Sequence, residues 1–134
     1  MYSFDERFLE ANIQVVSWPL SDVLLAKNAA YAWFVLVPRV TGATELIDLD
    51  DKQQQQLLLE SNTLSRWIKT YFSPDKLNVA MLGNIVSTLH LHHVGRYVDD
   101  PAWPGPVWGH PDSEEYNAGD IRNITEALEA VVVS

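Results

Sequence analysis

The sequence contains 134 residues, 47% of them hydrophobic, and no cysteine. This length and composition predict one domain, residues 1–134, with enough apolar surface to form a core, and the lack of cysteine excludes disulfide bonds and cysteine-ligated metal sites. The 18 acidic and 9 basic residues give a net charge of −9, which argues against binding of a nucleic acid polymer but is compatible with a small nucleotide in a local pocket.

Two observations bear on location. No apolar run reaches the ~18 residues needed to cross a bilayer, and the first residues lack the pattern of a signal peptide. We therefore expect no membrane partner and a cytoplasmic protein.

Short elements are predicted along the first part of the chain. Residues 5–11 are expected to form a short helix and residues 12–17 a strand. Residues 22–27 and 33–38 predict two more strands, because they are rich in β-branched and apolar side chains. A short turn near Asn28 separates these two runs, which indicates an antiparallel hairpin.

A long amphipathic helix follows. It is expected to begin at Asp50 or Asp51, where an acidic side chain can cap the helix and complement its dipole. Ser73-Pro74-Asp75 should end it, because proline cannot continue the hydrogen-bond ladder. Its apolar side chains recur at helical spacing and predict a core-facing stripe, which consists of Leu57, Leu64, Ile68 and Tyr71.

The second half of the chain predicts strands at residues 76–82 and 87–97, a stiff loop at 99–106 and a helix at 120–133. Strands joined by hairpin-type links around one long helix are typical of the α+β class. We therefore expect an antiparallel sheet with helices on one face.

The predicted strand at 87–97 carries three of the four histidines. Because side chains two apart in a strand share a face, His90 and His92 should lie together with Thr88, roughly 7 Å apart at the Cβ level, whereas His93 should face the other way. A neutral imidazole can be a nucleophile, a proton shuttle or a metal ligand. The pair alone is only moderately specific, because strand histidines often have a packing role.

The residues around the histidines make the pattern more specific. Asn78 and Gly83-Asn84 precede the histidines, and Arg96 and a Trp-Pro-containing segment that ends at Trp108 follow them. From about residue 23 to 108 this order resembles the histidine-triad (HIT) family of nucleotide hydrolases and transferases, whose motif runs His-φ-His-φ-His-φ-φ. The resemblance is closest to a bacterial branch in which the first histidine is replaced. It implies a HIT-like sheet of about five strands, one long helix, a C-terminal helix and a homodimer.

The resemblance assigns catalytic roles to two histidines. Thr88 takes the place of the first histidine of the motif, His90 that of the second and His92 that of the third. His90 would attack the α-phosphorus of a nucleotide ester, anhydride or phosphoramidate and form a nucleotidyl-histidine. His92 would donate a hydrogen bond to the phosphate oxygens. Trp33 takes the place of a separate upstream histidine.

Five residues become candidates for substrate binding. Asn84 replaces a glutamine that contacts the leaving group, Asn78 is at or next to an asparagine that contacts phosphate or ribose, and Trp108 closes over the site. Asn28 takes the place of an acidic residue that binds ribose hydroxyls, although a turn asparagine is an equally good interpretation. Thr88 completes the set. The resemblance implies no cofactor and no bound metal.

Three of the remaining polar residues have structural interpretations. His93 is expected to have a packing role or to be exposed, and His110 to be a loop residue. For Arg96 a surface ion pair is favoured over a phosphate contact.

Three functions remain open. The first is a HIT-type hydrolase or nucleotidyl transferase that acts through His90 on substrates such as diadenosine polyphosphates. The second is a nucleotide-binding protein with little turnover, and the third is a His-x-His metal protein that would need a third ligand.

Overall fold

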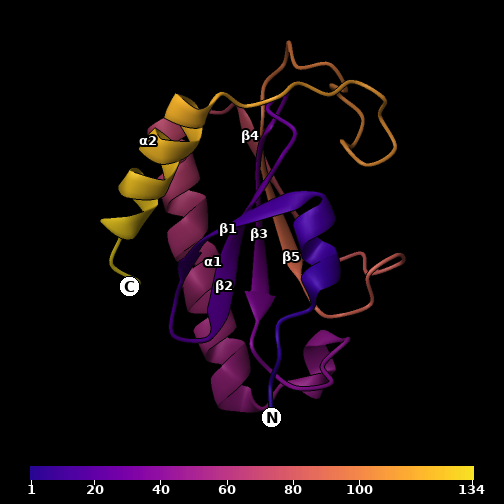
Figure 1. The fold of residues 1–134 in the computed structure, drawn as a ribbon, viewed down its shortest axis with the longest axis vertical. Coiled ribbons are helices and arrows are strands. Elements are labelled where there is room, and N and C mark those ends of the chain that lie inside the picture. Colours follow the sequence, from indigo (N-terminus) through magenta and orange to yellow (C-terminus); the bar gives the residue numbers. More distant parts are fainter.

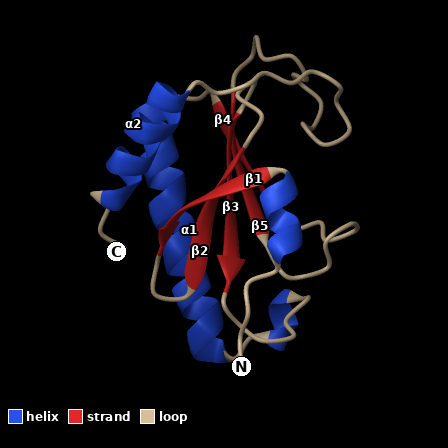
Figure 2. Ribbon diagram, in the orientation of Figure 1, coloured by secondary structure: helices blue, strands red, loops and turns tan.

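The computed structural model describes residues 1–134 and contains a five-stranded sheet in the order β1-β2-β3-β5-β4, in which every pairing is antiparallel. The strands are β1 (Asn12–Ser17), β2 (Ser21–Ala26), β3 (Ala32–Pro38), β4 (Lys76–Ala80) and β5 (Leu91–Arg96). The helices are η1 (Glu6–Glu10), η2 (Leu46–Asp48), α1 (Asp51–Phe72) and α2 (Ala118–Glu129), shown in Figures 1 and 2. The predicted α+β architecture with five antiparallel strands is confirmed.

The β2–β3 hairpin forms the centre of the sheet. All six residues of β2 are buried, and β3 pairs with β2 on one side and with β5 on the other. Strands that are buried on both faces have continuous apolar sequences rather than alternating ones, which is the pattern of residues 23–26 and 34–37. The hairpin was predicted within one residue at each of its four strand ends.

Helix α1 covers one face of the sheet. Asp50 caps it and forms a capping box with Gln53, while Ser73 ends it in the left-handed conformation (φ 49°) directly before a proline. Its predicted stripe packs into the main core, which also contains side chains of β2, β3, β5 and α2. Tyr71 is the exception, because it is 43% exposed and stacks on Trp67 instead.

The opposite face of the sheet is covered by η1 and by loops. Phe8 of η1 packs on Leu24, Val35 and Val37, whose side chains point away from α1. Figure 1 shows η1 on the other side of the sheet from α1 and α2. This second face carries the site described below.

Three predicted boundaries are wrong. The strand predicted at 76–82 ends at Ala80, the strand predicted at 87–97 begins at Leu91, and the helix predicted at 120–133 ends at Glu129. The last residue pair of the β4–β5 ladder is Ala80 with His92, so residues 81–90 form an irregular connection that turns at Gly83 (φ 76°). His90 therefore lies just before the strand and His92 lies inside it.

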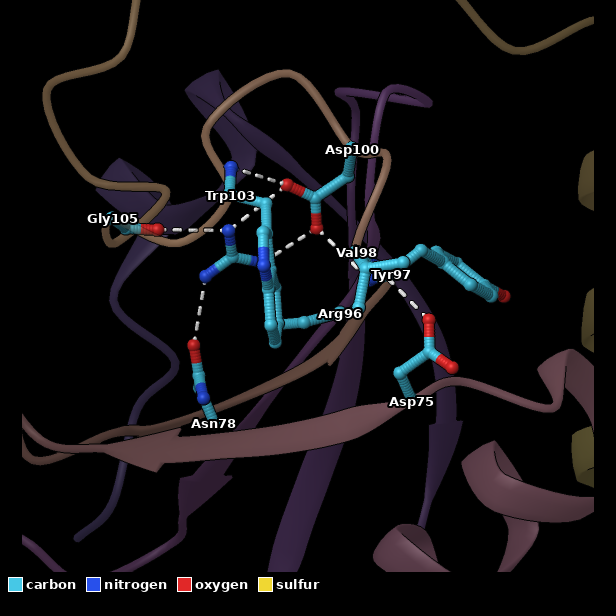
Figure 3. Close-up of polar contacts among 8 residues, drawn as sticks. All are labelled: Asp75, Asn78, Arg96, Tyr97, Val98, Asp100, Trp103 and Gly105. Atoms are coloured by element: carbon cyan, nitrogen blue, oxygen red, sulfur yellow. Dashed lines mark hydrogen bonds and ion pairs between the residues drawn. The ribbon is translucent and has the colours of Figure 1, made fainter.

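A buried arginine fixes the loop that follows β5 (Figure 3). Arg96 is 1% exposed and donates from Nε and Nη2 to the two carboxylate oxygens of Asp100, at 2.7 and 2.9 Å. Its Nη1 donates to Asn78 Oδ1 of β4 (2.9 Å), and its Nη2 also donates to the carbonyl of Gly105 (2.8 Å). The predicted ion pair is present, but it is buried rather than on the surface.

Within this cluster, Arg96 stabilises the charged form of Asp100. Burial alone would raise the pKa of Asp100, but the hydrogen bonds and charge of Arg96 and the backbone N–H groups of Tyr97 and Trp103 outweigh it, so this pKa is lowered.

No helix of the structure is both long enough and apolar enough to span a membrane.

Candidate functional site

A cavity of about 520 Å³ opens on the face of the sheet opposite α1. Its wall comes from η1, the turn after β2, β3, the 81–90 connection, β5 and the loop at 107–110. Its volume lies within the range of about 300–1,000 Å³ typical of small-molecule sites. The polar side chains in its wall are those of Arg7, Glu10, Asn12, Asn28, Asn84, His90, His92 and His110.

His90 presents a free ring nitrogen. Its Nδ1 lies 2.6 Å from the backbone carbonyl oxygen of Thr88. A carbonyl only accepts hydrogen bonds, so Nδ1 carries the proton, and in the neutral ring Nε2 keeps its lone pair. The ring is 8% exposed and packs edge-on against Phe8, with centroids 4.9 Å apart. The side chain is thus held in one orientation by a backbone acceptor and an aromatic wall.

His92 has the opposite arrangement. The indole N–H of Trp33 donates to His92 Nδ1 at 3.0 Å. An indole N–H is a donor only, so Nδ1 of His92 is unprotonated and Nε2 carries the proton. Burial, followed by the neighbouring His90 and His93, lowers the pKa of His92 to about 3, so the ring is neutral at ordinary pH.

The two rings therefore form a complementary pair. Their centroids are 4.9 Å apart at an interplanar angle of 70°. One ring offers a lone pair at Nε2, and the other offers an N–H at the equivalent position. A nucleophile beside a hydrogen-bond donor suits attack on a phosphoryl group, because the donor can stabilise the charge on a phosphate oxygen while the nucleophile forms its bond.

Tryptophan side chains frame this pair. The ring of Trp108 lies 5.2 Å from His92 and 6.1 Å from Trp33, in both cases close to perpendicular. Trp108 is partly buried, and its Nε1 has no hydrogen-bond partner within the chain. The structure places Trp108, one of the candidates from the sequence, in the wall of the cavity.

The structure brings Asn84 and Asn28 to the cavity in different ways. Asn84 is exposed in the 81–90 connection and has no partner that restricts its amide. The Asn28 amide donates to the carbonyl of Asp112 (3.1 Å), and its oxygen accepts from the N–H groups of Ala30 (3.0 Å) and Glu114 (3.1 Å). Asn28 thus fastens the loop after Trp108 to the turn after β2.

Two further candidates point elsewhere. Thr88 lies outside the wall of this cavity, and its hydroxyl donates to Asp5 Oδ2 at 2.8 Å, so only its carbonyl serves the site. Asn78 also lies outside the cavity, where its side-chain oxygen accepts from Arg96. The structure therefore gathers His90, His92, Asn28, Asn84 and Trp108, but not the side chains of Asn78 and Thr88.

The other two histidines are separate from the pair. His93 is fully buried on the α1 side, where Nε2 lies 2.7 Å from Ser61 Oγ and Nδ1 lies 3.1 Å from the carbonyl of Leu91. The packing interpretation of His93 is confirmed. His110 is in a loop as predicted, and it also lines the cavity.

No motif marks Arg7 and Phe8, although both line the cavity. They reach it because Asp5, which caps η1, binds Thr88 across 83 positions of sequence. Such a contact leaves no local spacing signal. Nowhere in the chain do three or more His, Cys, Asp or Glu side chains gather in a way that could hold a metal ion.

Comparisons with known proteins agree with this geometry. The model of the HIT domain matches residues 10–99. A histidine triad protein from Bradyrhizobium japonicum is 43% identical, with 98% of each chain covered and a TM-score of 0.93. One from Marinobacter aquaeolei VT8 is also 43% identical, over 96% of this chain and 94% of that one, with a TM-score of 0.91.

A third histidine triad protein, from Sinorhizobium meliloti 1021, is 30% identical over 98% of this chain and 97% of that one, with a TM-score of 0.92. A search among curated proteins gives no significant match.

Proposed function

This chain belongs to the HIT family, and we propose that it cleaves nucleotide esters, anhydrides or phosphoramidates at the α-phosphate through a nucleotidyl-histidine at His90. Family membership supports nucleotide binding or hydrolysis in general. The observation that carries the specific proposal is the complementary protonation of the two neighbouring rings, with a lone pair on His90 and an N–H on His92.

The reaction would proceed in two balanced steps. The lone pair of His90 Nε2 attacks the α-phosphorus, a phosphorus–nitrogen bond forms, and the bond from phosphorus to the leaving oxygen or nitrogen breaks. The leaving group departs with that electron pair and takes up a proton from the solvent. Water then attacks the same phosphorus, releases the nucleoside monophosphate, gives up one proton and restores the lone pair of His90.

The N–H of His92 would stabilise the charge that builds on a non-bridging phosphate oxygen. Because burial keeps this ring neutral, it donates without competing as a second base. The Asn84 amide, which no contact restricts, would bind the leaving-group side of the substrate.

Arg7 is the only lysine or arginine in the cavity wall. It is exposed and ion-paired with Asp5 at 2.7 Å. Within a chain of net charge −9, this side chain offers the local positive charge that a phosphate-bearing leaving group needs.

We also propose a homodimer that forms along β4. This strand pairs only with β5, so its other edge is free. A groove of about 480 Å³ between β4 and α1 is lined by Leu58, Val79 and Met81, which are 62%, 48% and 48% exposed. A free strand edge beside apolar side chains is a surface that proteins usually cover, and a second copy would cover it.

The experiment is a panel of diadenosine polyphosphates, adenosine phosphoramidates and their guanosine counterparts, assayed for release of nucleoside monophosphate. We expect turnover by the wild type, a gain in intact mass equal to one nucleotidyl group, and a loss of several orders of magnitude in His90→Ala. Thermal unfolding of the variant controls for folding. Nucleotide binding without any turnover would favour the binding protein, and a near-wild-type rate in His90→Ala would refute the mechanism.

A further inference from the structure

We infer that Trp33 is a positioning residue, which holds His92 in the tautomer that presents N–H at Nε2 to the cavity. The carrying observation is the 3.0 Å hydrogen bond from the indole Nε1 to His92 Nδ1. The inference rests on the proposed function for its catalytic meaning, because His92 acts there as a donor to phosphate. The tautomer itself can be measured without any turnover.

The strand register places the two side chains together. Trp33 of β3 pairs with Val94 of β5, and Val35 pairs with His92. Trp33 and His92 are therefore diagonal neighbours on one face of an antiparallel pair, within reach of a long aromatic side chain. This placement depends on the central strands of the sheet and not on a loop.

The indole ring is itself fixed on two sides. Tyr31 packs against it edge-on at a centroid distance of 6.3 Å, and Trp108 does so at 6.1 Å. Trp33 is partly buried between them, and its own ring contacts His92 at 5.8 Å. The direction of the N–H bond is therefore set by packing before any substrate arrives.

The chemistry of the donor decides the tautomer. A histidine in place of Trp33 could either donate a hydrogen bond to His92 or accept one from it, and it could take up a proton itself. An indole can only donate and does not titrate, so the proton of neutral His92 is confined to Nε2. His90, whose Nδ1 faces a carbonyl, is confined to the other tautomer. The division of roles between the two histidines thus depends on two fixed partners, one acceptor and one donor.

The test uses nitrogen-15 NMR of the histidine rings in the free protein at neutral pH. We expect wild-type His92 to show one tautomer, protonated at Nε2, and a scalar coupling across the hydrogen bond between Trp33 Nε1 and His92 Nδ1. Trp33→Phe keeps an aromatic ring but removes the N–H, and His92 should then populate both tautomers. Trp67→Phe, a tryptophan of α1 packed against Phe34 on the other face, is the matched control and should leave His92 unchanged.

Kinetics supply the second readout. With an active substrate from the panel, Trp33→Phe should lower kcat by about tenfold, the factor for one lost hydrogen bond, with little change in KM. An absence of turnover in the wild type would refute the proposed reaction but leave the NMR result standing. A wild-type His92 protonated at Nδ1, or an unchanged tautomer in Trp33→Phe, would overturn the inference. If Trp33→Phe does not fold, the coupling in the wild type decides alone.

Discussion

Acid should destabilise this protein through His93, whose imidazole is fully buried between the sheet and α1. Burial lowers the pKa of His93 from 6.5 to about 4, although its hydrogen bond to the carbonyl of Leu91 acts in the opposite direction. In the unfolded chain the ring takes up a proton near its ordinary pKa. The folded state cannot do so until the pH is much lower, so stability is complete above that ordinary value and is lost as the pH falls toward 4.

The size of the effect follows from the difference between the two pKa values. The linkage relation for one group that shifts from 6.5 to about 4 gives a loss of about 2 kcal/mol in the free energy of unfolding between pH 7 and pH 4.5. His92, with a pKa of about 3, adds a loss of the same sign. The carboxylates also contribute, so the total change of the free energy of unfolding with pH does not by itself give the contribution of His93.

A variant isolates the His93 contribution. His93→Gln removes the titrating ring, while its amide can still accept from Ser61. Urea unfolding of both proteins at pH 7 and pH 4.5 gives two differences in free energy, and the wild-type difference should be larger by about 2 kcal/mol. The contributions of the carboxylates cancel in this comparison, and so does the main part of the His92 contribution, because the largest cause of its lowered pKa is its own burial. Equal differences in the two proteins would refute the reasoning, as would an NMR titration that places the pKa of His93 near its ordinary value.

Three further predictions concern the loops and the β4 edge. Arg96→Met leaves the carboxylate of Asp100 buried without its partner and should cost about 3–5 kcal/mol in urea unfolding, and Asp100→Leu added to it should restore part of that loss. Asn28→Ala removes the acceptor of the Glu114 N–H, whose hydrogen exchange should become about tenfold faster, whereas an unchanged rate would refute the role of Asn28. Val79→Lys should convert the proposed dimer to a monomer in light scattering, whereas the control Val98→Lys, at a valine that is 62% exposed against 48% for Val79, should remain dimeric.

The helices and strands could be predicted because their signals are local. The acidic cap, the apolar stripe and the final proline of α1 all lie within the helix or next to it, and they predicted both ends within a residue. The alternation of His90 and His92 also predicted correctly that the two rings lie together, although His90 precedes the strand. Tyr71 followed the same spacing and still faces solvent, because it lies at the edge of the stripe.

The side-chain roles of Asn78 and Thr88 could not be predicted in the same way. Each is determined by a partner far away in sequence, Arg96 for Asn78 and Asp5 for Thr88. A spacing pattern places a residue on a face but does not say which neighbour takes up its hydrogen bonds. The sequence shows that Trp33 carries an indole N–H donor. That this N–H points toward His92 could be known only from the register between β3 and β5.

The hydrogen bonds that hold the chain on either side of Trp108 have a consequence for protein engineering. Arg96 holds the chain at Gly105, and Asn28 holds it at Asp112 and Glu114, so only a short tip between these points is free to vary. Gly109 sits in this tip with a positive φ and open space around it. Libraries in the tip should keep Val107, which is 3% exposed, and Trp108, which packs on Trp33 and His92. Changes at the remaining positions should alter which bases or leaving groups the proposed enzyme accepts, while the scaffold and the imidazole pair stay intact.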